Sequence, residues 1–126
     1  MNQLDILELA AKAAGWESRR YTVRDLTVLH VRAHRDDAWR HFDSFASAGD
    51  ALELAAAARI DMHHGGDFAG AYAGTGAFRQ FSHDDISDSS DYRNPHGERM
   101  RAMRRALTEC AAKIGRDIGE PWWRTL

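Results

Sequence analysis

The chain has 126 residues and a formal net charge of −2 at pH 7. This length supports one hydrophobic core, so we expect a single domain over residues 1–126. No apolar run approaches the roughly 20 residues that span a bilayer, and residues 1–15 lack the basic segment that opens a signal peptide. We therefore expect a cytoplasmic protein without a membrane segment.

The start of the chain predicts a helix followed by a β-hairpin. Apolar residues recur at helical spacing over Gln3 to Ala14, with Asn2 placed to cap the helix and Gly15 to end it. The many alanines of this helix favour close packing against strands. Two short extended segments follow, Trp16 to Tyr21 and Leu26 to Arg32, and the short polar stretch between them predicts a hairpin.

The middle of the chain combines an aromatic segment with a second helix. The segment from Ala33 to Phe45 has no sustained period, so it is either a loop with aromatic anchors or a single helical turn. Ser47, with Asp50 three residues later, matches a capping box, and the alanine-rich sequence that follows predicts a helix over residues 48–58. The aromatic residues of the segment from Ala33 to Phe45 recur at every third position: Trp39, Phe42 and Phe45.

Three short strands are expected after this helix. They cover Ile60 to His63, Asp67 to Ala73 and Ala77 to His83, with glycines in the turns between them. The bulky residues of the last strand do not keep a period of two, which predicts a bulge or twist near Gln80. A polar loop from Asp84 to Arg93 follows, acidic over residues 84–91.

The longest regular pattern of the chain predicts a final helix over residues 95–114. Asn94 and Pro95 form a typical helix start, and Gly115 is placed to stop the helix in the left-handed conformation. A single apolar stripe is expected to lie on the strands, and most of the remaining surface is basic. The stripe consists of Met100, Met103, Leu107, Cys110 and Ile114.

The order of these elements predicts the fold class. Helices and short strands that do not alternate regularly point to an α+β protein, in which helices cover a mostly antiparallel sheet. We expect a helix/sheet/helix sandwich with three helices and a sheet of about four to five strands. Cys110 lies on the apolar stripe and is expected to be a small core residue.

Three sequence patterns, in this order, resemble those of the phage ABA-sandwich domain, a family of small bacteriophage proteins. They are LELAAKAAG near the start, FxSxxSAGDALELA after Trp39, and the closing NPxxERxRAMRRALTECAAKIG from Asn94 to Gly115. The resemblance spans nearly the whole chain. It implies a helix/sheet/helix layering and a phage or prophage origin, and it implies no catalytic residues.

A metal site is one alternative for the histidines. His63 and His83, each close to aspartates, would bind a divalent metal only if their strands are neighbours, and their spacing matches no known ligand motif. We therefore expect no metal and no cofactor. Neither a Ser/His/Asp order nor a paired-carboxylate cleft stands out, so an enzyme is the less favoured interpretation.

Two groups of residues are candidates for binding. The tail contains Trp122, Trp123 and Arg124, and because neighbouring side chains of an extended segment diverge, one tryptophan is expected to face a partner. The alternative is that both rings complete the core. The last helix contributes a second group, which consists of Arg101, Arg104 and Arg105.

Two classes of function remain open. The first is a phage or prophage accessory protein without catalytic activity that binds a host protein or other macromolecule in the infected cell, for example to inhibit a defence system. Self-association into a homo-oligomer is compatible with it. The second is a protein that binds or hydrolyses a nucleotide signal, through the glycine turns, the histidines and the arginines of the last helix.

Overall fold

The computed structural model describes residues 2–65, 68–74, 78–82 and 95–118. Within these residues the protein is α+β, with three helices and two antiparallel three-stranded sheets. The helices are α1 (Gln3–Ala13), α2 (Ala48–Ala58) and α3 (Pro95–Asp117). The first sheet is formed by β1 (Glu17–Val23), β2 (Leu26–Arg32) and β3 (Arg40–His41), and the second by β4 (Ile60–His64), β5 (Phe68–Ala73) and β6 (Phe78–Ser82).

Local signals place both ends of α1 as expected. Asn2 accepts a hydrogen bond from the Asp5 amide at 2.9 Å, and the Asp5 carboxylate accepts one in return from the Asn2 amide, so a complete capping box starts the helix. Gly15 has φ of +78°, a conformation that glycine adopts without steric cost. The prediction for this helix is confirmed to within one residue.

The first sheet begins with the predicted hairpin. Val23 pairs with Leu26 across a turn in which Arg24 has φ of +58°, and the register continues without interruption to Glu17 and Arg32. Because residues two apart in a strand point to the same side of a sheet, Leu29 and Val31 share one face, and both are buried there. The segment after the hairpin is a loop with one two-residue strand, as in the first of the two alternatives for residues 33–45.

Helix α2 has the bounds predicted for it, but its capping box is incomplete. The Ser47 hydroxyl accepts a hydrogen bond from the Asp50 amide at 3.1 Å. The Asp50 carboxylate turns instead to the preceding loop, where it accepts from the Asp43 amide at 2.9 Å. The helix ends at Arg59, which has φ of +58° and leads directly into β4.

The second sheet has a regular register. β5 pairs with β4 on one side and β6 on the other, and every residue of β6 has one partner in β5. Of the bulge or twist predicted near Gln80, the bulge is wrong, because Gln80 pairs directly with Gly70 and its neighbours keep the same spacing; the twist stays a prediction.

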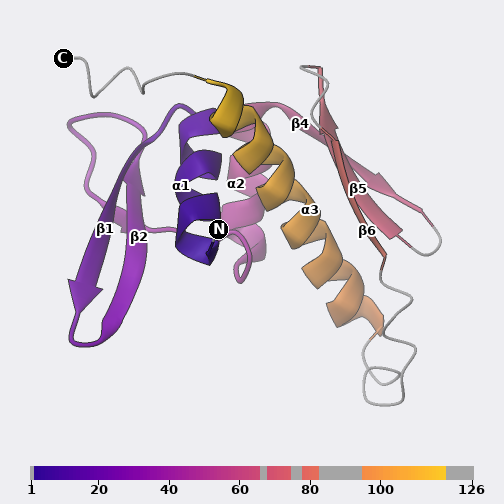
Figure 1. Ribbon diagram of the computed structural model, residues 1–126, viewed down its shortest axis with the longest axis horizontal. Coiled ribbons are helices and arrows are strands. Elements are labelled where there is room, and N and C mark those ends of the chain that lie inside the picture. The colour runs from indigo at the N-terminus through magenta and orange to yellow at the C-terminus, as the bar shows by residue number, and fades with distance from the viewer. Residues whose placement is uncertain (1, 66–67, 75–77, 83–94, 119–126) are drawn as a thin grey trace.

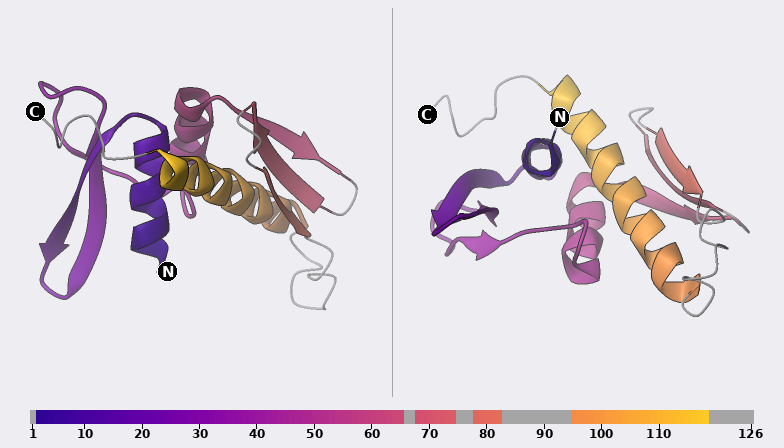
Figure 2. Two further views of the ribbon diagram at one scale, coloured as in Figure 1. Left: turned by 45° about the horizontal axis from the view of Figure 1, so that its top comes forward. Right: turned by 60° about the horizontal axis from the view of Figure 1, so that its bottom comes forward.

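Helix α3 lies at the centre of the molecule, with α1 and α2 on one side and the β4–β6 sheet on the other (Figure 1; Figure 2, right). The expected stripe is correct for Met103, Leu107 and Cys110, which are at most 5% exposed. Because α3 is contacted by helices on one side and by a sheet on the other, it needs more buried positions than a single apolar stripe provides. The additional buried residues are Glu98, Ala102, Ala106, Thr108, Ala111, Ala112 and Gly115.

Gly115 has a different role from the predicted one. The helix continues through it to Asp117, and Gly115 is not among the described residues with positive φ. A Cβ at this position would lie 1.9 Å from the Leu9 carbonyl oxygen, which is a backbone atom of α1. Gly115 thus allows a close backbone approach between α1 and α3, and α1 packs more extensively on α3 than on strands.

The layering also differs from the expected helix/sheet/helix order. The strands do not form one sheet of four to five strands but two separate sheets, and the helices lie between them (Figures 1 and 2). The physical reason is that α3 is apolar around much of its circumference in its second half and needs cover on opposite sides. In the part of the chain that the structure describes, no helix has the length and apolar character needed to cross a membrane.

Candidate binding site

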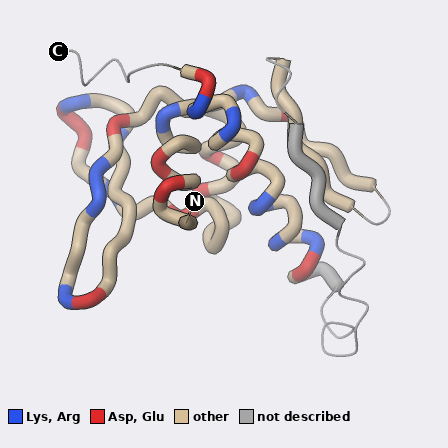
Figure 3. The backbone as a smooth tube through the Cα atoms, viewed as in Figure 1, with Lys and Arg blue, Asp and Glu red and all other residues tan. Residues whose placement is uncertain are grey.

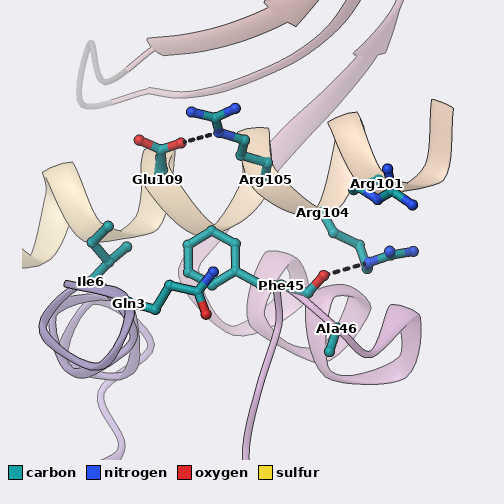
Figure 4. A pocket seen from close by; sticks show the side chains of 8 residues that line it. All are labelled: Gln3, Ile6, Phe45, Ala46, Arg101, Arg104, Arg105 and Glu109. Atoms are coloured by element: carbon teal, nitrogen blue, oxygen red, sulfur yellow. Dashed lines mark hydrogen bonds and ion pairs between the residues drawn. The ribbon is translucent and has the colours of Figure 1, made fainter. Parts of the chain in front are cut away.

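The three arginines predicted to bind a ligand lie together. Arg101, Arg104 and Arg105 line one pocket with a volume of about 620 Å³ between α1, α3 and the loop before α2 (Figure 4). The remaining lining residues are Gln3, Ile6, Phe45, Ala46 and Glu109. We refer to this cavity as the arginine pocket. Figure 3 shows the basic positions along the first half of α3 from which its arginines come.

Phe45 forms an apolar wall inside this pocket. Figure 4 shows its ring between the α1 side chains Gln3 and Ile6 and the side chain of Arg104. The backbone of Phe45 is fixed on both sides, because its amide donates to the Asp43 carboxylate at 3.0 Å and its carbonyl accepts from Arg104 Nε at 2.7 Å. The aromatic wall is therefore held in place before any ligand arrives.

Loop 43–47, which carries Phe45, is also attached to α3 through a buried pair of hydroxyl groups. Ser44 and Thr108 are both fully buried, with their oxygens 2.7 Å apart. The Thr108 hydroxyl donates to the Arg104 carbonyl at 2.7 Å, so its single proton is already used. Ser44 must then be the donor to Thr108. This chain of hydrogen bonds fixes the distance between the loop and the helix.

The charges of the pocket do not cancel. Arg105 Nε donates to the Glu109 carboxylate at 3.0 Å along the rim, and Arg101 pairs with Glu98, whose side chain is only 7% exposed. Arg104 differs, because the partner of its Nε is a neutral carbonyl group. Glu98 and Glu109 each offset one arginine, so among the described residues the charge of Arg104 is left without a carboxylate partner, and this favours an anion in the cavity.

A smaller apolar groove lies on the other side of Arg104. It has a volume of about 230 Å³ and runs between α2, α3 and β4. Leu52 and Met62, at its edge, are 60% and 47% exposed. Its remaining lining residues are Ala48, Ala51, His64, Met100, Met103, Arg104 and Leu107.

The outer face of the β1–β2 hairpin is a third candidate surface. Tyr21, Val23 and Leu26 share this face by register and are 44%, 50% and 67% exposed. At its base, the guanidinium carbons of Arg19 and Arg32 lie 4.4 and 4.3 Å from the ring centroid of Trp39. We call this surface the hairpin face. Cation–π contacts of this kind order long side chains that would otherwise move freely.

Three ion pairs hold the hairpin on the domain and order its outer face. On the inner side, the hydrogen bond from Arg20 lowers the pKa of Asp5 below its usual value, and Arg20 also pairs with Glu8 of α1. On the hairpin face, Arg32 donates to Glu17 at 2.9 Å and lowers the pKa of that carboxyl. Both carboxylates are thus stabilised in the charged form.

Most of the other predicted site residues fall on parts of the chain that the structure does not describe. Trp122, Trp123, Arg124 and His83 lie outside the described residues. His63 is exposed on β4, where its ring lies 5.6 Å from that of Phe68. Over the described ranges, no group of three or more His, Cys, Asp or Glu residues has a geometry that holds a metal ion.

Sequence reasoning missed several residues of these surfaces. Gln3 and Ile6 line the arginine pocket from α1, but nothing in their local pattern places them near residue 45. The hairpin face could have been predicted from the sequence. Side chains of a β-hairpin alternate between two faces, and the face that does not pack on the core stays uncovered. Tyr21, Val23 and Leu26 lie on that uncovered face.

Comparison of the chain with family models, curated proteins and solved structures gave no match.

Proposed function

We propose that this chain is a phage or prophage accessory protein without catalytic activity, which binds a host protein in the cytoplasm of an infected bacterial cell. The phage origin rests on the sequence resemblance described above. The binding function rests on one structural observation, which is the exposed apolar residues of the hairpin face. Inhibition of a bacterial defence protein is the consequence of binding that we propose.

Exposed apolar side chains on one ordered face support the binding role. Tyr21, Val23 and Leu26 are each at least 44% exposed and lie on adjacent paired positions of a two-stranded ribbon. Contiguous apolar surface of this kind, rimmed by polar groups, is typical of protein interaction sites. Arg19 and Trp39 beside it belong to the residue types that carry most binding energy in such interfaces.

The charge of the hairpin face favours a different protein over a second copy of this chain. Two arginines, Arg19 and Arg32, and one carboxylate, Glu17, surround Trp39 on this face. In a symmetric dimer built on the same face, the excess positive charges of the two copies would approach each other. A partner with apolar residues and carboxylates would complement the face in both respects.

The test compares a hairpin variant with a control on another surface. Leu26→Asp removes apolar area at a site that is 67% exposed, so the fold is expected to persist. Leu52→Asp makes the same change at a site that is 60% exposed on α2. Host proteins captured by the wild-type chain are identified by mass spectrometry, purified, and titrated against all three chains.

The proposal predicts that one purified host protein binds the wild type and the Leu52→Asp variant alike and binds Leu26→Asp at least about tenfold more weakly. Arg19→Glu should weaken the same complex and reduce its dependence on salt. Equal binding by all chains would overturn the assignment of the hairpin face. A concentration-dependent dimer of the wild type that Leu26→Asp abolishes would instead identify self-association.

A further inference from the structure

We propose that the arginine pocket binds a nucleoside phosphate, with the phosphate on Arg104 and Arg101 and the base on the ring of Phe45. This inference concerns a surface separate from the hairpin face and stands independently of the partner proposed there. It rests on the shape of the cavity, on the arrangement of its donors and on the fixed position of its aromatic wall.

The dimensions of the cavity suit a small molecule. Its volume of about 620 Å³ lies within the range of roughly 300 to 1,000 Å³ that is usual for small-molecule sites. Its walls come from three separate parts of the chain, namely α1, the loop before α2, and α3 (Figure 4). Figure 4 shows Ile6 and the Phe45 ring toward the α1 end of the pocket and Arg101 and Arg104 toward the other end, so one end of a ligand would meet apolar atoms and the other end positive charge.

Arg104 is the residue best placed to hold a phosphate. Its Nε donates to the Phe45 carbonyl at 2.7 Å, which fixes the plane of the guanidinium group. Among the described residues no other partner of this guanidinium group is found, and its side chain is only partly buried. The two terminal nitrogens can therefore present N–H groups in the fork geometry that matches two phosphate oxygens.

Arg101 supplies the second positive charge one helical turn away. Arg101 forms an ion pair with the buried carboxylate of Glu98. This pair restricts the Arg101 side chain, which still lines the pocket. A phosphate between the two guanidinium groups would be held by charge-assisted hydrogen bonds, which are stronger than those between neutral groups.

Phe45 and Gln3 suit the remaining part of a nucleotide. An aromatic ring whose backbone is fixed on both sides offers a stacking surface at low entropic cost, and base stacking on such rings is favourable for every base. Gln3 adds one amide group, which provides both donors and an acceptor for the edge of a base. Sugar phosphates and inorganic anions would use the arginines but leave this wall unused.

The probes are the four nucleoside 5′-monophosphates, two cyclic dinucleotides (one of adenosine and one of guanosine), the free nucleosides, and inorganic phosphate. Each is titrated into the intact chain up to 5 mM and followed by calorimetry and by NMR. We expect at least one nucleotide to bind at least about tenfold more tightly than phosphate and than its own nucleoside, with affinity that falls as salt rises.

Variants separate the two halves of the site. Arg104→Gln should weaken nucleotide binding about tenfold or more, because it removes a charge-assisted contact to the phosphate. Phe45→Leu should weaken the nucleotide but leave the weak affinity for phosphate unchanged. Arg99→Gln is the matched control, since Arg99 is an exposed arginine of the same helix that does not line the pocket. It is expected to bind as the wild type does, and the melting temperature of each variant reports its folding.

Three results would overturn the proposal. One is that no probe binds below 5 mM. Another is that inorganic phosphate binds as tightly as every nucleotide, which would mean an anion site without a base wall. The third is that Arg99→Gln lowers affinity as much as Arg104→Gln while both remain folded, which would mean attraction by net charge alone.

Discussion

The two halves of α3 differ sharply in burial and in charge. From residue 106 to 112 the helix is buried at every position except Glu109, and Ala106, Cys110 and Ala111 have no exposed surface. From residue 99 to 105 it carries four arginines, of which Arg99, Arg101 and Arg105 are exposed. The same element is thus packed almost all round in its second half, whereas its first half combines a buried side with long, exposed charged side chains.

The difference follows from side-chain size. Alanine and glycine allow helix backbones to approach closely, and Gly115 against Leu9 is the extreme case in this protein. Long side chains hold neighbouring elements apart, which is why the arginine pocket and the apolar groove both lie along the first half. Substitutions should therefore affect mainly stability in the second half and mainly binding in the first.

The largest effect is expected at Leu107, which is 2% exposed at the start of the buried half. Leu107→Ala should lower the free energy of unfolding by about 2 to 5 kcal/mol, because it removes buried methyl groups and leaves a cavity. Met100→Ala, two stripe positions earlier and only partly buried, should cost clearly less. Chemical denaturation measures both. Equal losses would show that the two halves are packed alike.

Gly115→Ala tests the close approach of α1 and α3. Alanine favours a helix by about 1 kcal/mol over glycine, but its Cβ would lie 1.9 Å from the Leu9 carbonyl oxygen, so the helices must separate. We expect a net loss of about 1 to 3 kcal/mol, as for other overpacked sites. Gly49→Ala in α2 is the control, because its Cβ would meet only Ser47 Oγ at 3.7 Å. It should be neutral or stabilising, and a stabilising Gly115→Ala would contradict the close approach.

The buried hydroxyl pair predicts an asymmetric result. Thr108→Val leaves the Ser44 hydroxyl buried without the acceptor described above and should cost about 1 to 3 kcal/mol. Ser44→Ala leaves the Thr108 proton on the Arg104 carbonyl and should cost only about 1 kcal/mol. The double variant should lose less than the sum of the two, as measured by denaturation. A larger loss for Ser44→Ala would reverse the assigned direction of the hydrogen bond.

Features set by neighbouring residues could be predicted from the sequence. The cap at Asn2, the bounds of α2 and the hairpin at Arg24 all depend on residues within a few positions, and each was correctly predicted. The capping box at Asp50 was only half correct, because a loop residue, Asp43, competes for its carboxylate.

Features set by contacts between distant segments were mostly missed. The stop predicted at Gly115 was wrong because the glycine is required by α1, about one hundred residues earlier in the chain. The single sheet was wrong because strand pairing depends on where α3 packs. The arginines of the pocket were identified from their clustering, whereas Phe45 and Gln3 join them only in the folded chain.

The smallest effect is expected for Arg105→Gln in the first half of α3. This change removes the Arg105–Glu109 pair, an exposed i,i+4 ion pair with an N–O distance of 3.0 Å. Such pairs stabilise helices by about 0.3 to 0.5 kcal/mol, and salt screens them, so the melting temperature should fall only slightly and less at high salt. Nucleotide binding should weaken less than in Arg104→Gln, because Glu109 partly neutralises Arg105 at the rim. A stability loss above about 1 kcal/mol would mean that the first half of α3 is structural as well.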